Sequence, residues 1–464
     1  MILLAGFLDV LFRALVFVGL ALSVGGIAFY YIVLRPSRAG DASCRKTASL
    51  VVAGAFLVAA SQLLALLTSA AALGDPSDPW PIAVLLRTSF ARAGLSHAGF
   101  AAILGLAALP LLNRPSSWPW WAATTAAGVM VMTSGAWLTH GASRMSDAAA
   151  LMAVTVVHQL GAVVWIGGLI HVTTQWRLLT HSRGSEDLWP RMLGRFSPLA
   201  LTSVLIFVGA GIYLAWKYIG SWAGLVGTAY GSMLLTKIVL MAVLLLLGGI
   251  NNLTIRHWTL TGDPEQLYRR TPAFAEVEAA VGVIILMTAA ALTSQPPSID
   301  VVSDRATPAE VAYVFMPKAP RLTPPPHAEM IATASSSTDP YALPGDISRR
   351  QSDFNHNVSG ILVILIGLAA LVNRTTGWRW TRNWPLLFVP LGLFLLVIGE
   401  PNGWPLGPEP FWNTLIAPEV MTHRLATAIV AVLAIVTWRV EEGPWSATRW
   451  RYVLPVMTFV GGAL

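Results

Sequence analysis

The chain has 464 residues, of which 55% are hydrophobic and only 11% are charged. Soluble domains carry about 25% charged residues, so this composition excludes an ordinary soluble protein. The net charge of +7 is scattered over many loops and forms no single basic patch, so we expect no nucleic acid partner.

Twelve apolar stretches, each about as long as a bilayer crossing requires, follow one another along the chain. Because every backbone polar group must be satisfied inside a bilayer, each stretch is predicted to be a helix. The predicted spans are 14–34, 47–73, 94–112, 118–138, 148–172, 198–219, 232–252, 274–294, 356–372, 384–399, 419–438 and 452–464. The sequence therefore predicts an all-α, polytopic transmembrane helix bundle with about 12 spans.

Basic residues concentrate in alternate loops, those that follow the odd-numbered spans. These loops hold more than half of the 30 Lys and Arg residues, and the positive-inside rule places them in the cytoplasm. The single cysteine, Cys44, permits neither a disulfide framework nor a cysteine-based metal site. We therefore expect a multi-pass protein of a bacterial inner membrane whose N-terminus is periplasmic.

A segment rich in Pro, Ser and Thr, residues 295–355, interrupts the pattern and is predicted to be a periplasmic linker. It separates an eight-span bundle, residues 1–294, from a four-span bundle, residues 356–464. Only about 13 residues of the last span precede Leu464, fewer than a crossing needs. We therefore expect the natural protein to continue beyond that residue.

Histidine and methionine are the residues that could carry chemistry, and they recur near the outer ends of spans in both bundles. The candidate metal ligands are His97, His140, Met145, Met152, His158, His356, Met421 and His423. Imidazole and thioether ligands together suit copper, and thioethers favour Cu(I). Met145 and Met152 share a helix face if one helix covers both. The pattern predicts copper binding at the periplasmic side, with His158 as the strongest intramembrane candidate.

Each candidate has a plainer explanation. Methionine is an ordinary core residue, and a histidine near a span end can cap a helix or bond a loop. His171, His181 and His257 lie among arginines and are expected to be interfacial. Two buried charges, Lys237 and Glu278, lie near opposite ends of neighbouring spans, and Lys237 is expected to extend outward to the interface.

Two other functions use the same residues. In a redox protein that passes electrons, haem b or copper would be the cofactor, and the haem ligands would come from His97, His158, His356 and His423. The lack of histidine pairs at equal depth argues against haem. In an assembly scaffold, the chain would serve a separate copper enzyme. No acid–base pair or activated nucleophile is found, so we expect no enzymatic activity of its own.

Three strings between about Arg195 and Pro297 resemble the copper resistance D (CopD/PcoD-like) family: RFSPLAL, TAYGSMLLTKIVLMAVLLLLGGINN and EVEAAVGVIILMTAAALTSQPP. Upstream, HQLGAVVWIGGLIHV resembles the segment that leads into this region. FNHNVSGILV and PEVMTHRLA resemble the C-terminal membrane extension of longer members.

The resemblance implies an inner-membrane protein of copper homeostasis or resistance that moves copper across the membrane. It also implies a small periplasmic copper-binding partner of the CopC type. His97, His140 and His158 are carried over as candidate ligands, and Lys237 and Glu278 fall within or beside the matching strings.

Overall fold

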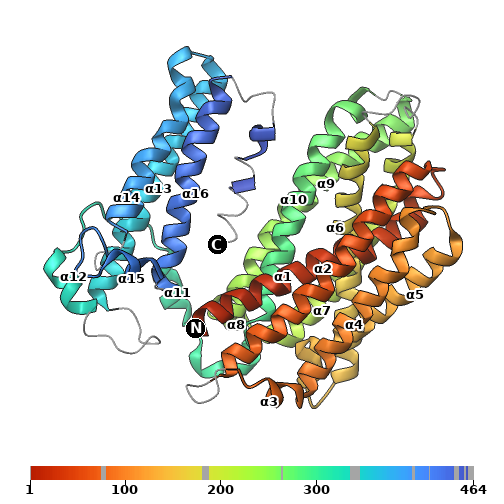
Figure 1. Cartoon of the computed structure of the whole chain (residues 1–464), viewed down its shortest axis with the longest axis horizontal. Coiled ribbons are helices and arrows are strands. Elements are labelled where there is room, and N and C mark those ends of the chain that lie inside the picture. The colour runs from red at the N-terminus through yellow and green to blue at the C-terminus, as the bar shows by residue number, and fades with distance from the viewer. Residues whose placement is uncertain are drawn as a thin grey trace. The chain divides into compact units, whose positions relative to one another are not determined.

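The computed structural model describes residues 2–74, 80–179, 188–262, 265–334, 345–399, 403–416, 418–443, 449–453 and 456–457. Within these ranges the regular structure is helical and contains no β-strand, which confirms the all-α prediction. The chain divides into two compact units, Met1–Phe315 and Met316–Leu464 (Figure 1). Their division falls inside the segment that the sequence predicts to be a linker.

The first unit is a bundle of long helices. They are α1 (Ile2–Phe29), α2 (Asp41–Leu73), α4 (Ser89–Ala108), α5 (Trp118–Gly135), α6 (Ala148–Leu179), α7 (Leu188–Ile219), α9 (Ala229–Thr261) and α10 (Glu265–Thr293). Its short elements are η1 (Tyr30–Leu34), α3 (Ile82–Leu86), η2 (Leu109–Leu112), η3 (Ala136–Leu138), η4 (His140–Ser143), α8 (Trp222–Val226), η5 (Ser298–Asp300), η6 (Val302–Asp304) and α11 (Pro308–Phe315). We call the end at which α1, α4, α6 and α9 begin the outer end, and the opposite end the inner end.

The second unit has three longer helices. Its elements are α12 (His327–Ala334), α13 (Asp346–Thr376), η7 (Arg379–Leu387), α14 (Phe388–Val397), α15 (Phe411–Ile416), α16 (Pro418–Glu441) and η8 (Arg449–Tyr452). Helix α14 packs against both α13 and α16. Helix α12 and the first turns of α13 lie within residues 295–355, where the sequence predicts a linker.

Ten helices among the described residues are long and apolar enough to cross a membrane. They match ten of the twelve predicted spans, so the chain is a multi-pass membrane protein. The span predicted at 118–138 forms α5, which packs against α4 but is not one of the ten. The span predicted at 452–464 lies mostly outside the described residues.

Several helices begin earlier than the sequence predicts. The expected start of the first span is residue 14, directly after Arg13, whereas α1 begins at Ile2. Arg13 Nε donates to Asp9 Oδ2 over 2.7 Å, one turn back on the same helix. This pair offsets both charges, so the helix continues through them. Helices α7 and α10 likewise continue through Pro198 and Pro272.

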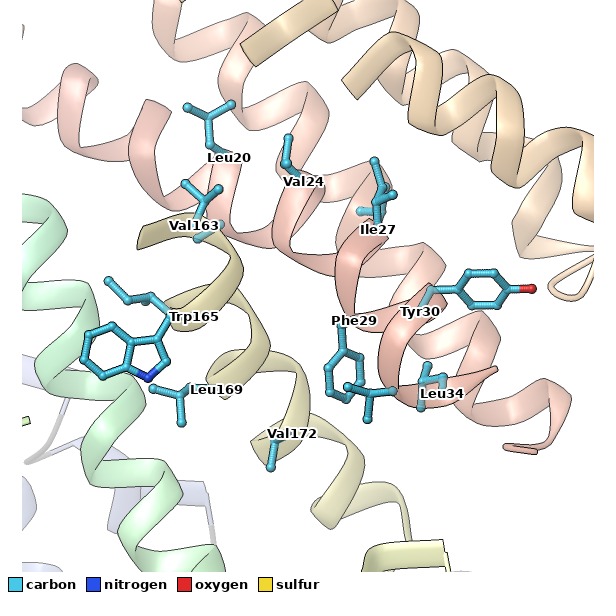
Figure 2. Packing of buried hydrophobic residues seen from close by; sticks show 14 of the residues in the cluster. Leu20, Val24, Ile27, Phe29, Tyr30, Leu34, Val163, Trp165, Leu169 and Val172 are labelled. Carbon is cyan, nitrogen blue, oxygen red and sulfur yellow. The ribbon is translucent and has the colours of Figure 1, made fainter. Parts of the chain in front are cut away.

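Helix α1 lies at the centre of the first unit and packs against α2, α6 and α10. Figure 2 shows Leu20 and Val24 of α1 near Val163 of α6, and Leu169 farther along α6 near Phe29; all belong to the main buried cluster. The close approach depends on glycine. A Cβ on Gly167 would lie 2.0 Å from the carbonyl oxygen of Ala21. The two helix backbones therefore touch at this crossing, as small residues allow in membrane bundles.

At the outer end, the segment after α10 is attached to the start of α9. Ser298 is fully buried, and its hydroxyl lies 2.7 Å from Oγ1 of Thr228. Thr228 also caps α9, because its Oγ1 accepts a hydrogen bond from the backbone N–H of Gly231 over 3.0 Å. Residues 298–306 are thereby held against the first unit, where Ala306 N donates to Gly227 O.

Replacing Thr228 with Val should lower the free energy of unfolding by about 1–2 kcal/mol, because the helix cap and the buried bond to Ser298 are both lost. The measurement is the thermal unfolding midpoint of the full chain in detergent. Thr236→Val is the matched control, since this exposed hydroxyl bonds only Ser232 O of its own helix. Equal midpoints for the two variants would contradict the prediction.

Candidate functional site

Three helices of the first unit bring His158, Phe207 and Lys237 together. His158 lies 10 residues after the start of α6, Phe207 lies 12 before the end of α7, and Lys237 lies 8 after the start of α9. At 1.5 Å per residue, all three lie about 12–18 Å from the outer ends of their helices. Their depths therefore match, inside the part of the bundle that would lie in the bilayer.

The hydrogen bonds of His158 fix which ring nitrogen carries the proton. Nδ1 lies 2.8 Å from the carbonyl oxygen of Phe207, which can only accept, so Nδ1 donates. The ring also stacks on the Phe207 side chain, with centroids 4.2 Å apart. Nε2 is therefore the nitrogen with the lone pair. A histidine that is held through Nδ1 and presents Nε2 has the arrangement of an oriented metal ligand.

Lys237 occupies the other side of the same ring. Its Nζ lies 3.3 Å from Nε2 of His158 and 5.2 Å from the centre of the Phe207 ring. The side chain is thus directed into the bundle, and the expectation that it extends outward to the interface is wrong. None of the ion pairs among the described residues includes Lys237.

Two methionines that we did not predict as ligands share the helix face of Lys237. Met233 and Met241 lie four residues before and after it on α9, so they stack above and below it. Both are half-buried: Met233 packs against the outer cluster around Tyr218, and Met241 packs against the main cluster. Each methionine lies four residues from a basic residue within a span, and this spacing could have identified them from the sequence.

His140 lies in η4, at the outer end of the bundle. Its Nε2 is buried and has no hydrogen-bond partner within the described part of the chain. Burial lowers the pKa of His140, and the guanidinium of Arg13 lowers it further, so the ring is neutral at pH 7. The ring packs edge-on to Tyr218, with centroids 6.3 Å apart. The neutral imidazole keeps a lone pair that a cation can bind, and the nearby charge of Arg13 weakens that binding.

Two ion pairs hold the loop that carries His140. Arg144 donates two hydrogen bonds to Asp300, over 3.0 and 2.8 Å, and Lys217 Nζ donates to Asp147 over 2.9 Å. The first pair joins the loop to η5, and the second joins it to the end of α7. Both pairs are partly exposed, so they fix the loop more than they stabilise the fold.

His97 lies on α4 and is 2% exposed. Its Nδ1 is 3.1 Å from Oγ of Ser134, whose own hydrogen is donated to Val131 O. Nδ1 therefore donates to Ser134, and Nε2 carries the lone pair. Its ring faces α5, whereas that of His158 faces α7 and α9. The contacts thus place His97 and His158, the two candidate haem ligands of the first unit, against different helices.

The predicted methionine pair does not form one face. Helix α6 begins at Ala148, so Met145 precedes it, in the loop, with a fully exposed side chain. Met152 is half-buried on the first turns of α6. The condition for a shared face, that one helix covers both residues, is not met.

The candidates of the second unit lie on α13 and α16. His356 is exposed, and its Nδ1 donates to Ser352 O of its own helix over 2.7 Å. On α16, His423 is exposed and Met421 is half-buried. Throughout the described residues, no three His, Cys, Asp or Glu side chains converge on a point that would hold a metal ion.

Two more residues singled out in the sequence, Glu278 and His171, are buried in the inner half of the first unit. Glu278 of α10 accepts a hydrogen bond from Nδ2 of Asn251, which lies at a similar depth on α9. His171 is fully buried and not interfacial as expected: its Nε2 donates to Leu22 O over 3.0 Å, and its ring stacks on Phe29. His257 is exposed near the inner end of α9, and His181 lies outside the described residues.

Comparison with known proteins gives two family matches on the first unit. The model for copper resistance protein D matches residues 190–292, and the model for the N-terminal domain of copper resistance protein D-like proteins matches residues 4–147. Together these segments hold His97, His140, Lys237 and Glu278, whereas His158 falls in the interval between them.

A curated relative is the copper transport protein CutJ of Bacillus subtilis (strain 168), which is 27% identical over 296 residues. The match covers 61% of this chain and 52% of the relative, so the chain spans about half the length of the curated relative it matches. No solved structure matches the chain. Two family models that match successive parts of one helix bundle, together with this relative, give the same result: the chain belongs to the copper resistance D family of multi-pass membrane proteins.

Proposed function

We propose that the chain is an inner-membrane copper-handling protein that binds copper at the periplasmic side through His and Met and moves it across the membrane. Copper is the cargo in this proposal. Family membership and the name of the curated relative support copper as the ion. The positive-inside rule supports a periplasmic outer end.

The observation that carries the proposal is the tautomer of His158. Its Nδ1 is committed to the Phe207 carbonyl, which leaves the Nε2 lone pair directed into the bundle between α6 and α9. Thioether ligands favour Cu(I), and imidazole nitrogen also suits copper. Met233 and Met241, on the same face of α9 as Lys237, supply thioethers one turn above and below this level.

Several weak ligands at successive depths suit conduction better than one strong site. His140 at the outer end would receive the ion, with Met152 next along α6, and His158 would hold it within the bilayer. Binding that is favourable enough to admit an ion and weak enough to release it is the general requirement for passage.

The two units of the chain would have different roles. The first unit is an eight-span bundle that contains the path, and the second unit, with His356, Met421 and His423, is a four-span extension. A periplasmic copper-binding protein of the CopC type would deliver the ion to the outer end. The exposed Met145, in the loop that also carries His140, would meet that partner first.

The first experiment is to measure the metal content of the detergent-purified full chain by mass spectrometry, with a visible spectrum of the same sample. We expect about one copper per chain after loading with Cu(I) and removal of free metal, and no Soret band. A chelator wash should remove the copper without unfolding the chain, since a large buried apolar cluster holds the helices of the first unit together.

Two outcomes would overturn the proposal in different ways. A Soret band in proportion to protein would place haem b on the histidines and make electron transfer the function. A chain that retains neither copper nor haem but copurifies with a copper enzyme would favour the assembly scaffold.

A further inference from the structure

The copper path proposed above gives no role to the contact between Lys237 and His158. An ammonium group inside a membrane-spanning helix is costly unless a partner satisfies it. No carboxylate within the described ranges forms an ion pair with Lys237. Its contacts are instead a neutral imidazole nitrogen at 3.3 Å and an aromatic face at 5.2 Å. Both stabilise a cation, and neither neutralises it.

The imidazole nitrogen that Lys237 contacts is the one that a metal would use. Because Nδ1 of His158 donates to the Phe207 carbonyl, Nε2 has one lone pair, and the Lys237 ammonium donates to it. A copper ion that bound there would have to replace this ammonium. The two positive charges would also repel each other strongly in a low-dielectric interior. Occupation of Nε2 by copper and by Lys237 is therefore mutually exclusive.

We propose that Lys237 is a tethered cation that holds the His158 acceptor while copper is absent, and that copper and Lys237 occupy Nε2 alternately. This inference rests on the proposed function, because it takes His158 as a copper ligand. Copper entering from the outer end would displace the Lys237 ammonium. The return of the ammonium to Nε2 would then promote release of the ion.

The position of Lys237 on α9 suits this role. It lies only eight residues from the outer end of the helix, and its flexible four-carbon side chain can turn toward that end when the ion binds. Met233 and Met241 flank it on the same face of α9, so displacement of the lysine would leave the imidazole nitrogen free, with a thioether one turn above and one turn below the level of Lys237. The positive charge of Lys237, between the two methionines, prevents a permanent copper site from forming.

The test is Cu(I) affinity of the full chain in detergent, measured by competition with a chromophoric Cu(I) chelator. The variants are Lys237→Met, Lys237→Gln, Lys237→Arg, His158→Ala and the double variant with Lys237→Met and His158→Ala. The two neutral substitutions should tighten Cu(I) binding by at least about tenfold, which corresponds to about 1.4 kcal/mol. Lys237→Arg keeps the charge and should bind as the original chain does.

Lys46→Met is the matched control for loss of a lysine. Lys46 is exposed near the start of α2, at the inner end and away from the proposed ligands, so its loss should leave Cu(I) affinity unchanged. Two neutral variants are used because one of them could fail to fold; size-exclusion profiles identify the folded ones.

The outcomes separate this inference from the function on which it rests. If His158→Ala weakens binding but both neutral variants of Lys237 bind like the original chain, the inference is wrong and the copper site stands. If His158→Ala binds like the original chain, the site itself is wrong. If the double variant binds as weakly as His158→Ala, the gain from removing the lysine acts through His158, as we propose.

Discussion

Copper uptake should fall at least about tenfold when His158 is replaced with Ala, since removal of even an indirect partner of a metal ligand costs about 10–100-fold in affinity or activity. The substitution removes the Nε2 lone pair at the level where α6, α7 and α9 meet. Uptake would be measured as copper accumulated by cells or sealed vesicles that contain the full chain, relative to those that lack it.

The control must separate loss of a ligand from loss of the protein. His257→Ala removes an exposed histidine near the inner end of α9 and should leave accumulation unchanged. Because His158→Ala also deprives Lys237 of its acceptor, the double variant with Lys237→Met shows whether the unsatisfied ammonium destabilises the chain. Unchanged accumulation in a normally inserted His158→Ala chain would remove His158 from the path.

Most of the fold follows from the sequence because the bilayer imposes one solution on each long apolar stretch. The helix ends were harder to predict. Charged and proline residues usually mark the end of a span, yet α1 contains the Asp9–Arg13 pair and α7 continues through Pro198. An i,i+4 pair is visible in the sequence, so the first of these could have been predicted.

Only part of the candidate site could be predicted from the sequence. His158 could be predicted because an intramembrane histidine is rare, and the pairing of Glu278 with Asn251 follows from their depths. The contact between His158 and Lys237 could not be predicted, because it depends on how α6 and α9 are rotated about their axes. Depth along a helix is readable from residue numbers, but rotation is set by packing against neighbours.

The same limit explains His171. Its position near the arginines of the following loop suggests the interface, but the ring is turned toward α1 and stacks on Phe29. Close approach of α1 and α6 makes this possible, since a Cβ on Gly26 would lie 2.6 Å from its Nε2. The glycines that permit the approach are in the sequence, but which helix they face is not.

Replacing Gly167 with Ala should lower the free energy of unfolding by about 3 kcal/mol or more, at the upper end of the cost of overpacking. The new Cβ would lie 2.0 Å from the carbonyl oxygen of Ala21, and neither backbone can yield without separating α1 from α6. That separation would open the main buried cluster, to which Leu20 and Val24 of α1 and Val163 of α6 belong (Figure 2). The measurement is the thermal unfolding midpoint in detergent, together with the yield of monodisperse protein.

Gly209→Ala provides a matched comparison. Gly209 lies within the spanning helix α7, and a Cβ there would meet no atom within 4 Å apart from the backbone of its own helix. Because alanine is the better helix former by about 1 kcal/mol, this variant should be as stable as the original chain or slightly more stable. If the two variants unfold at the same temperature, the α1–α6 contact does not limit stability. If only Gly167→Ala unfolds at a lower temperature, the contact between α1 and α6 limits the stability of the bundle. That contact also positions α6, the helix that carries His158.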